Sequence, residues 1–383
     1  MTTRTTLATQ IRNKALLAGG AVALLAASGL AQAATPATTY NLYVSPTGSD
    51  SASGSKAYPF RTIARAIKSL RPSTTVWVAP GTYAGGFRNT VSGTASGRIY
   101  FVSTTKWGAK IVPPTTSPND VAWDNRGSYV DIIGFQVDGS GYKYGTKWRY
   151  GIYNGGSYDS IRENYVHHIA KNIACTSGGG SAIGADSYYK GVKAEIISNV
   201  VHDIGPAGCH FVQGIYMSTS GVIKNNAVYR VAEAAIHLWH DARDVIITNN
   251  TVTSSGTGII VGGGDFYFTT GGANYVHVYS NIVYDNKYGI SEQGRTGTSN
   301  TYRNNLVYKN TYPWTLKNGL KHYNTVAAAP GFTYYSRTGT QNLKITSSSP
   351  AVRRGTSTYA HPTDIVGRPR NSTTGFDIGA YQH

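Results

Sequence analysis

Short strand-like segments with the same order of apolar and polar positions recur through the middle of the chain. The first signal is an Asn, one further residue and an aliphatic, β-branched residue, with steps of 35, 27, 24, 31 and 24 residues between Asn164-Tyr165-Val166, Asn199-Val200-Val201, Asn226-Ala227-Val228, Asn250-Thr251-Val252, Asn281-Ile282-Val283 and Asn305-Leu306-Val307. Phe135-Gln136-Val137 occupies the same slot one repeat earlier. The second signal is a small residue followed by Ile, at Gly151-Ile152, Ala182-Ile183, Gly214-Ile215, Ala235-Ile236, Gly258-Ile259 and Gly289-Ile290.

Two interleaved strand signals at this spacing predict a solenoid, in which each coil adds one strand to each of several parallel sheets. We therefore predict an all-β fold, a single-stranded right-handed parallel β-helix. Alternation within the strands directs each Ile into the core and its neighbour outward. The recurring Asn falls at a bend, where its amide is expected to bond to the Asn above and below. Steps of unequal length indicate insertions that loop out on the surface.

The ends of such a stack need covers, because an open coil exposes core and sheet edge. Helix periodicity over Thr62–Leu70 predicts a short N-terminal capping helix with Ile63, Ala66, Ile67 and Leu70 on its apolar face. After Pro313 the Asn pattern fades. We expect a signal peptide over residues 1–33, a cap and first coils over 40–90, the β-helix core over 91–311, and C-terminal coils with an irregular cap over 312–383.

The two cysteines fall at nearly the same place in successive coils. Cys175 follows Asn164 by 11 residues, and Cys209 follows Asn199 by 10. Stacked strands are about 4.8 Å apart, a spacing that suits the Cα separation of a disulfide. The register therefore predicts a Cys175–Cys209 bridge between two long loops.

The N-terminus carries the features of an export signal, and the charge indicates the kind of partner. Arg4, Arg12 and Lys14 precede an apolar run over residues 15–27, and a small-x-small site ends at Ala33. We predict a secreted or periplasmic protein without a membrane span, and a monomer. Cleavage would lower the formal charge from +17 to +14, a balance that attracts polyanions. For an exported chain we expect an acidic polysaccharide and no nucleic acid.

The two ends of the mature chain resemble secreted bacterial right-handed β-helix proteins, a group that includes pectate-lyase-like polysaccharide lyases. The resemblance rests on Tyr43-Val44-Ser45-Pro46-Thr47-Gly48-Ser49-Asp50, Tyr58-Pro59-Phe60-Arg61-Thr62-Ile63, Val78-Ala79-Pro80-Gly81-Thr82-Tyr83, Ser349-Pro350-Ala351, Gly367-Arg368-Pro369-Arg370 and Asp377-Ile378-Gly379-Ala380-Tyr381. It implies action on a polysaccharide and a substrate groove along an exposed sheet. The aspartate cluster by which pectate lyases bind calcium has no counterpart here, nor do the polygalacturonase and alginate-epimerase signatures. The sequence requires no cofactor, assigns no metal site and leaves calcium open.

We assign the groove to the strands with the small-Ile signal. Their outward positions form one column of Tyr153, Gly184, Tyr216, His237, Ile260 and Ser291, and a second of Gly155, Asp186, Ser218, Trp239, Gly262 and Gln293. The run from Ala235 to Arg243 gathers two histidines, a tryptophan, a carboxylate and an arginine in one coil. Such a concentration of titratable groups favours a catalytic role.

β-Elimination from a uronate needs a base, an acid and a cation that offsets the developing charge. We predict His237 or His240 as the base, Tyr216 as the acid or its exchange partner, and Arg243 as the cation. Substrate contacts are expected from Trp239, Tyr153, His210, Asp241, Glu233, Asp265 and Tyr267. Several carboxylates near this sheet keep a glycoside hydrolase open as an alternative. The sequence also leaves open a uronate epimerase and a non-catalytic polysaccharide-binding surface protein.

Overall fold

The computed structural model of the protein describes residues 39–115, 120–141, 148–373 and 375–383. The signal peptide expected over residues 1–33 lies outside these ranges. Within them, helix is confined to α1 (Ile63–Ile67) and the 3-10 helix η1 (Ser187–Tyr189). None of the helices in the described ranges has the length and apolar character that a membrane crossing needs.

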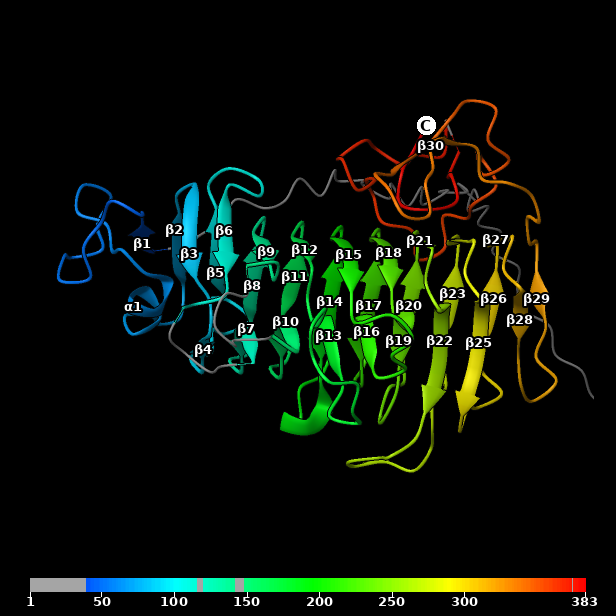
Figure 1. Cartoon of the computed structure of the whole chain (residues 1–383), viewed down its shortest axis with the longest axis horizontal. Helices are drawn as coiled ribbons and strands as arrows, with labels where there is room; N and C mark the ends of the chain where they lie inside the picture. Colours follow the sequence, from blue (N-terminus) through cyan, green and yellow to red (C-terminus); the bar gives the residue numbers. More distant parts are fainter. Residues whose placement is uncertain (1–38, 116–119, 142–147, 374) are drawn as a thin grey trace, which may run out of the picture. The chain divides into compact units, whose positions relative to one another are not determined.

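Three parallel sheets, named A, B and C, make up the stack (Figure 1). Sheet A holds β1 (Tyr40–Val44), β2 (Thr74–Val78), β5 (Ile99–Ser103), β8 (Val130–Ile133), β11 (Ser160–Arg162), β14 (Ala194–Ile197), β17 (Gly221–Lys224), β20 (Val245–Thr248), β23 (His277–Tyr279), β26 (Thr301–Arg303) and β29 (His322–Tyr323). Sheet B holds β3 (Gly81–Ala84), β6 (Ala109–Val112), β9 (Gln136–Asp138), β12 (Tyr165–His167), β15 (Val200–Ile204), β18 (Ala227–Val231), β21 (Thr251–Thr253), β24 (Ile282–Tyr284) and β27 (Leu306–Tyr308). Sheet C holds β4 (Phe87–Asn89), β7 (Val121–Asn125), β10 (Tyr150–Asn154), β13 (Gly180–Ala185), β16 (Val212–Met217), β19 (Ala234–Leu238), β22 (Thr257–Gly263), β25 (Tyr288–Gly294) and β28 (Tyr312–Thr315).

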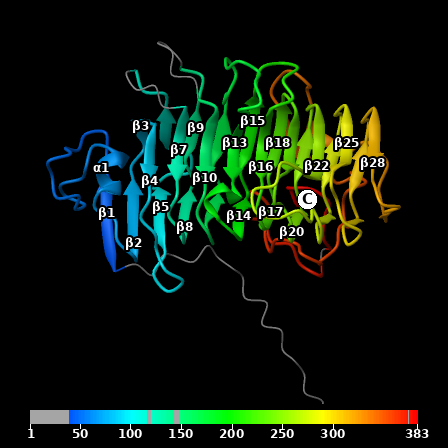
Figure 2. The ribbon, with the colours of Figure 1, turned by 90° about the horizontal axis from the view of Figure 1, so that it is seen from below.

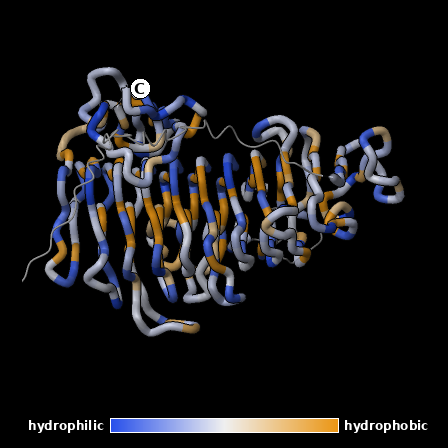
Figure 3. The backbone as a smooth tube through the Cα atoms, turned by 180° about the vertical axis from the view of Figure 1, so that it is seen from behind, coloured by the Kyte–Doolittle hydropathy of each residue, from blue (hydrophilic) through white to orange (hydrophobic). Residues whose placement is uncertain are grey.

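The chain visits sheets A, B and C in turn, and each strand pairs in parallel with the strand one coil later (Figure 2). This confirms the predicted right-handed parallel β-helix. Apolar and polar positions alternate along the strands (Figure 3). The inward positions form one continuous core of aliphatic and aromatic side chains.

The predicted asparagine ladder is present and runs through six coils. Each amide nitrogen donates to the amide oxygen of the Asn in the next coil, at 2.9–3.1 Å, from Asn164 through Asn199, Asn226, Asn250 and Asn281 to Asn305. The same nitrogen also donates to a backbone carbonyl of the preceding coil, as Asn250 does to Ile223. Each amide oxygen accepts a backbone N–H as well, so the ladder satisfies polar groups that the bend buries.

The structure explains why a small residue precedes each Ile, which simple alternation of inward and outward positions does not. Strand pairing skips this position, as at Gly151 between Tyr150 and Ile152, and both the small residue and the Ile face the core. A Cβ on Gly151 would lie 2.9 Å from Val166 Cγ1, and one on Gly258 would lie 2.4 Å from Val283 Cγ1. A bend therefore stands at each small residue, and the residue before it faces outward.

Both ends of the stack are covered. Helix α1 closes the N-terminal end with Ile63, Ala66 and Ile67 buried and with Thr62 as its N-cap, although it is shorter than the predicted segment. At the other end Trp314, together with Leu316 and Leu320, packs against the last coil. The rest of the tail, including the antiparallel pair β30 (Phe332–Tyr334) and β31 (Asn342–Ile345), returns along the outer face of sheet B (Figure 1).

The predicted disulfide joins Cys175 and Cys209, whose Cα atoms are 5.5 Å apart. Each cysteine belongs to a loop that enters sheet C, the first before β13 and the second before β16. The bridge therefore fixes two neighbouring loops to each other at the edge of this sheet.

Candidate functional site

A cleft of about 450 Å³ lies on the outer face of sheet C. Its floor comes from β10, β13, β16 and β19, and its walls come from three loops. Two of these, residues 177–180 and 210–211, directly follow the bridged cysteines, and the third follows β22. The expected groove therefore coincides with a hollow that strands of sheet C line.

The central column of the floor follows the register expected from the sequence. Tyr153 pairs with Gly184, Gly184 with Tyr216, and Tyr216 with His237. Because Gly184 has no side chain, the floor is hollow between the two tyrosines. The His237 ring meets the Tyr216 ring edge-on at 5.3 Å between centroids.

His237 has unused hydrogen-bonding capacity in the cleft, as does the hydroxyl of Ser181 among the described residues. Both of its ring nitrogens are buried and have no hydrogen-bond partner among the described residues. Burial, aided by the neighbouring His240, lowers the pKa of His237 to about 3, so the ring is neutral near neutral pH. Burial also raises the pKa of Tyr216, which keeps its hydroxyl protonated. The pair thus presents a neutral imidazole beside a phenol.

His240 is held in one tautomer by two partners from the loop after β22. Its Nδ1 lies 2.8 Å from the carbonyl oxygen of Asp265, an acceptor, so Nδ1 carries the proton. Its Nε2 lies 2.9 Å from the hydroxyl of Tyr267, which donates to it. The two rings also stack with 4.2 Å between centroids. His240 therefore positions this loop over the cleft, and its proton-accepting nitrogen is already in use.

Trp239 lies flat on a cradle of glycines. A Cβ on Gly262, Gly264 or Gly294 would come within 2.8 Å of the indole ring. The indole N–H donates to Asp265 Oδ2 at 3.1 Å. Glycines on two successive strands therefore fix a flat aromatic surface at one end of the cleft, the kind of surface on which sugar rings stack.

Two carboxylates face the cleft. Asp186 accepts hydrogen bonds from the Tyr153 hydroxyl and the Ser218 hydroxyl, both at 2.7 Å. Asp265 belongs to the loop after β22 and accepts from Trp239. Burial and the charge of Asp186 raise the pKa of Tyr153, so its proton stays on the phenol.

Amides and basic groups are found at the edges. The Gln213 and Gln293 side chains line the cleft, whereas no Lys or Arg side chain does so among the residues that the structure describes. Cations stand at the rim instead. The Arg126 guanidinium lies over the Tyr153 ring at 4.3 Å, and Arg149 donates to the carbonyl of Gly179 at 3.2 Å.

His210 and Glu233 form a pair beside the cleft. His210 Nδ1 lies 2.9 Å from Glu233 Oε2, and the histidine side chain is 79% exposed. Glu233 also accepts a hydrogen bond from the Thr257 hydroxyl at 3.3 Å. Of this pair, His210 lines the cleft, and Glu233 holds it from the bend between β18 and β19.

Arg243 and Asp241 do not line the cleft, in contrast to the sequence expectation. The backbone turns at His240, which has a φ of 48°, so the residues after it point away. Asp241 is buried and accepts from the backbone N–H groups of Phe268 and Thr269, which anchors the loop after β22. Arg243 pairs with Asp244 at 3.0 Å and lines a separate hollow.

A third column of outward-facing side chains was not predicted from the sequence. Tyr150, Ser181 and Gln213 are paired in register and line the cleft beside the central column. Strict alternation counted back from each Ile turns this column inward. The small residue before each Ile was the available signal, because it marks the bend that turns the preceding side chain outward.

The comparisons with known proteins agree with this architecture. The family described as "Protein of unknown function (DUF1565)" matches residues 46–90. The solved structure of pectate lyase Pel9A superimposes with a TM-score of 0.62 at 17% identity, covering 90% of this chain and 97% of that one. A rhamnogalacturonan lyase gives 0.46 at 16% identity, covering 77% and 91%, and the A-module of the mannuronan C-5 epimerase AlgE6 from Azotobacter vinelandii gives 0.49 at 14%, covering 69% and 68%. No curated protein matches the sequence. The chain has the pectate-lyase-like right-handed parallel β-helix fold.

Proposed function

We propose that the protein is an exported polysaccharide lyase, which cleaves an acidic, uronate-containing polysaccharide by β-elimination. The observation that carries the proposal is the pair at the centre of the cleft, a neutral His237 without a partner among the described residues beside a protonated Tyr216. Two titratable groups whose environments keep one as a base and the other as an acid are the arrangement that proton transfer needs.

In the proposed reaction the His237 ring accepts the proton on the carbon next to the uronate carboxylate. The electron pair forms a carbon–carbon double bond, the glycosidic oxygen leaves, and the Tyr216 hydroxyl protonates it. A bound carboxylate would also raise the pKa of His237, since a nearby negative charge favours the imidazolium. Substrate binding therefore strengthens the base.

The group that offsets the carboxylate charge is expected to differ from the sequence prediction. Arg243 faces another hollow, whereas the amides of Gln213 and Gln293 line the cleft and offer N–H donors. Arg149 at the rim would attract the neighbouring uronates of a long chain, whereas the charge of Arg126 is balanced by its ion pair with Asp124. Trp239 supplies a stacking surface for one sugar ring.

A glycoside hydrolase is the second candidate, because Asp186 and Asp265 face one cleft without a Lys or Arg among its described lining residues. Hydrolysis uses two carboxylates on either side of the scissile bond. Export is part of the proposal in either case. A disulfide fits an oxidising compartment, and residues 1–33 have the sequence features of a signal peptide.

The deciding experiment supplies the purified protein with a panel of uronate-containing polysaccharides and follows ultraviolet absorbance together with reducing ends. A lyase produces both, because each cleavage leaves an unsaturated uronate. Reducing ends without absorbance would establish hydrolysis, and altered uronate composition without cleavage would establish epimerisation. Binding without any turnover would make the protein a polysaccharide-binding one. Each of these three results overturns the lyase proposal.

A matched pair of tyrosine variants ties the activity to this cleft. Tyr216→Phe removes only the proposed acid and should lower turnover by about 100-fold or more. Tyr308→Phe makes the same change on an exposed tyrosine of sheet B and should leave turnover unaltered. Equal activity of both variants would remove Tyr216 from the mechanism.

A further inference from the structure

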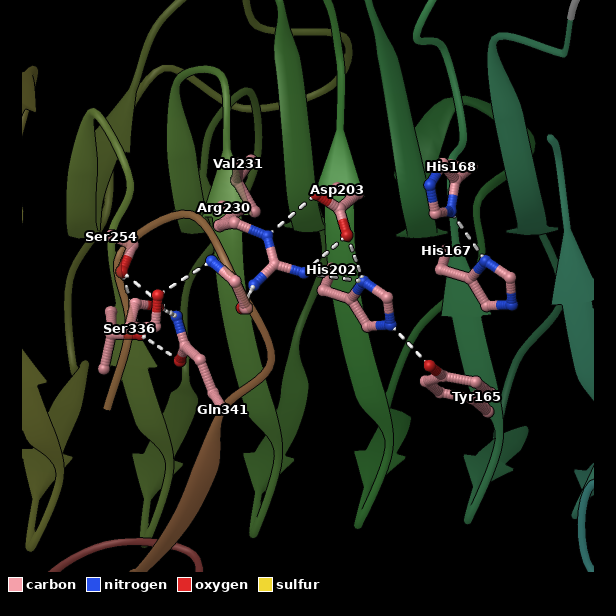
Figure 4. Close-up of polar contacts among 12 residues, drawn as sticks. Tyr165, His167, His168, His202, Asp203, Arg230, Val231, Ser254, Ser336 and Gln341 are labelled. Atoms are coloured by element: carbon pink, nitrogen blue, oxygen red, sulfur yellow. Dashed lines mark hydrogen bonds and ion pairs between the residues drawn. The ribbon is translucent and has the colours of Figure 1, made fainter. Parts of the chain in front are cut away.

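Three side chains of the types that bind metal ions lie close together on sheet B, on a different sheet from the cleft. Asp138 ends β9, His167 ends β12, and the two residues are paired in register on neighbouring coils. His168 follows directly. One ligand atom from each of the three side chains falls within 4.8 Å of the other two. Figure 4 shows the two histidine rings converging.

Consecutive side chains on a strand normally point to opposite faces, so this convergence needs a cause. His168 leaves the strand with a φ of 56°, which turns its ring back toward His167. The fold itself supplies this turn, because the equivalent position in the next two coils, Asp203 and then Arg230, also has a positive φ. What is particular to this coil is that both positions hold histidine.

The donor atoms are close to the positions that a metal ion requires. His167 Nδ1 lies 2.8 Å from His168 Nδ1, and 3.5 Å from Asp138 Oδ1. Two nitrogen ligands of a tetrahedral zinc ion, each about 2.0–2.1 Å from it, lie about 3.3 Å apart. Opening the pair by a few tenths of an ångström therefore makes room for the ion. Imidazole nitrogens with a carboxylate oxygen are a ligand set typical of zinc and related ions.

In the next coil, His202 and Asp203 stand at the positions of His167 and His168, and there the histidine nitrogens are bonded to other protein groups. His202 stacks on His167, with ring planes 5° apart. However, its Nδ1 lies 2.5 Å from Asp203, and its Nε2 lies 2.7 Å from the Tyr165 hydroxyl. Arg230 completes this network by pairing with Asp203 at 2.6 Å (Figure 4). In the preceding coil, by contrast, the Nδ1 atoms of His167 and His168 face each other, and His167 Nδ1 also faces Asp138.

Two neighbours already orient the ligands. Lys110 Nζ lies 2.6 Å from Asp138 Oδ2, whereas Oδ1 accepts the backbone N–H of Ser140 at 2.9 Å and also faces His167. Gln136 Nε2 lies 2.8 Å from His167 Nε2. Because amide oxygen and nitrogen exchange by a simple rotation, the Gln136 oxygen can accept a hydrogen bond from Nε2–H, and Nδ1 of that tautomer is then free as a ligand.

We propose that Asp138, His167 and His168 bind one divalent ion of the first transition series, zinc foremost, with water completing the coordination. Binding through both Nδ1 atoms requires the proton between them to move to a ring Nε2, so that each neutral imidazole keeps one N–H. The ion would tie two adjacent coils together through their side chains. This site is separate from the cleft, so the proposal does not depend on the lyase reaction.

Titration calorimetry of the tag-free protein with zinc chloride tests the site, with calcium chloride as the comparison. We expect one zinc per chain and at least about tenfold weaker zinc binding in His168→Asn, whose new residue tolerates the positive φ. Asp138→Asn should weaken binding by a similar factor. His322→Gln, which changes a histidine of sheet A outside the cluster, should bind zinc as the unmodified protein does.

Two further readouts separate specific binding from a damaged fold. Zinc should raise the unfolding temperature of the unmodified protein and of His322→Gln but not of His168→Asn. Cobalt(II) should give the visible spectrum of a four- or five-coordinate site in the unmodified protein and in His322→Gln, and not in His168→Asn. Absence of zinc binding, zinc binding no tighter than calcium binding, or equal zinc affinity in folded His168→Asn would each overturn the proposal.

Discussion

The outer faces of sheets B and C come from the same coils, but the described C-terminal tail covers part of sheet B and contributes no residue to the cleft on sheet C. On sheet B the outward residues Ala227, Ile282 and Leu306 are buried under apolar residues of the C-terminal tail. On sheet C the equivalent strands carry Tyr216 and His237, which line an open cleft. The covered face has an apolar outward column, and the free face has a polar and aromatic one.

This difference teaches where function resides in a repetitive fold. The inward positions of both sheets are alike, because they serve one core. Only the outward positions differ, and they agree with what covers them. A histidine on the covered face, His202, has both ring nitrogens bonded to protein groups, whereas His237 on the free face has neither bonded among the described residues. The free ring nitrogens of His237 next to a hollow are therefore one reason for placing the proposed reaction on sheet C.

The largest expected effect comes from replacing His237 and His202, one at a time, with glutamine. On a polysaccharide that the protein cleaves, His237→Gln should lower kcat by about 1000-fold, because the proposed base is lost. Its unfolding free energy should change little, since neither ring nitrogen has a partner to lose within the described ranges. His202→Gln should do the reverse, with kcat retained and roughly 1–3 kcal/mol of stability lost. Steady-state kinetics and denaturant unfolding of both variants measure this, and loss of kcat in His202→Gln would contradict the division of roles.

A change to the ladder should weaken both faces together. Asn250→Ala removes the acceptor of the backbone N–H and of one side-chain N–H of Asn226. It also leaves the Ile223 carbonyl and the Asn281 amide oxygen with one donor fewer each. We expect a loss of roughly 3 kcal/mol or more in the free energy of unfolding, measured by urea titration. Asn342→Ala, at an exposed position of β31, should cost less than about 1 kcal/mol by the same measurement. Similar losses in the two variants would mean that the ladder adds no particular stability.

A smaller effect is expected where the glycine cradle holds Trp239. A Cβ on Gly262 would lie 2.8 Å from the indole and 3.0 Å from the carbonyl oxygen of Gln293, so Gly262→Ala must displace the ring. We expect kcat/KM to fall about tenfold, mainly through KM, because the stacking surface moves. Gly271→Ala adds the same methyl group where no atom lies within 4 Å, and serves as the control. An unchanged KM in Gly262→Ala would remove Trp239 from substrate binding.

The smallest expected effect is at Arg243. Because its guanidinium pairs with Asp244 and lines a separate hollow, Arg243→Gln should leave kcat/KM within about twofold. Gln293→Ala, in the cleft, should lower it more. If the arginine variant loses more activity than the glutamine variant, the charge-offsetting role returns to Arg243.

Much of the fold and part of the site could be predicted because both follow the repeat. The Asn slots, the column from Tyr153 to His237 and the cysteine pairing depend only on register, which a sequence displays directly. The positions of Arg243 and Asp241 depend on a backbone turn at His240, and a left-handed residue other than glycine has no strong sequence signal. The path of the tail over sheet B depends on contacts between segments far apart in the chain, which periodicity does not reveal.

The unequal spacing of the ladder has a consequence for how such a protein acquires an activity. Two of the intervals between rungs are 24 residues long, and this length suffices to complete a coil. The three longer intervals are the ones that supply residues 177–180, residues 210–211 and the loop after β22, and so the walls of the cleft. Surplus length thus builds the cleft while the rungs keep their hydrogen bonds. A lineage can therefore lengthen or exchange these segments and test new substrates without altering the scaffold.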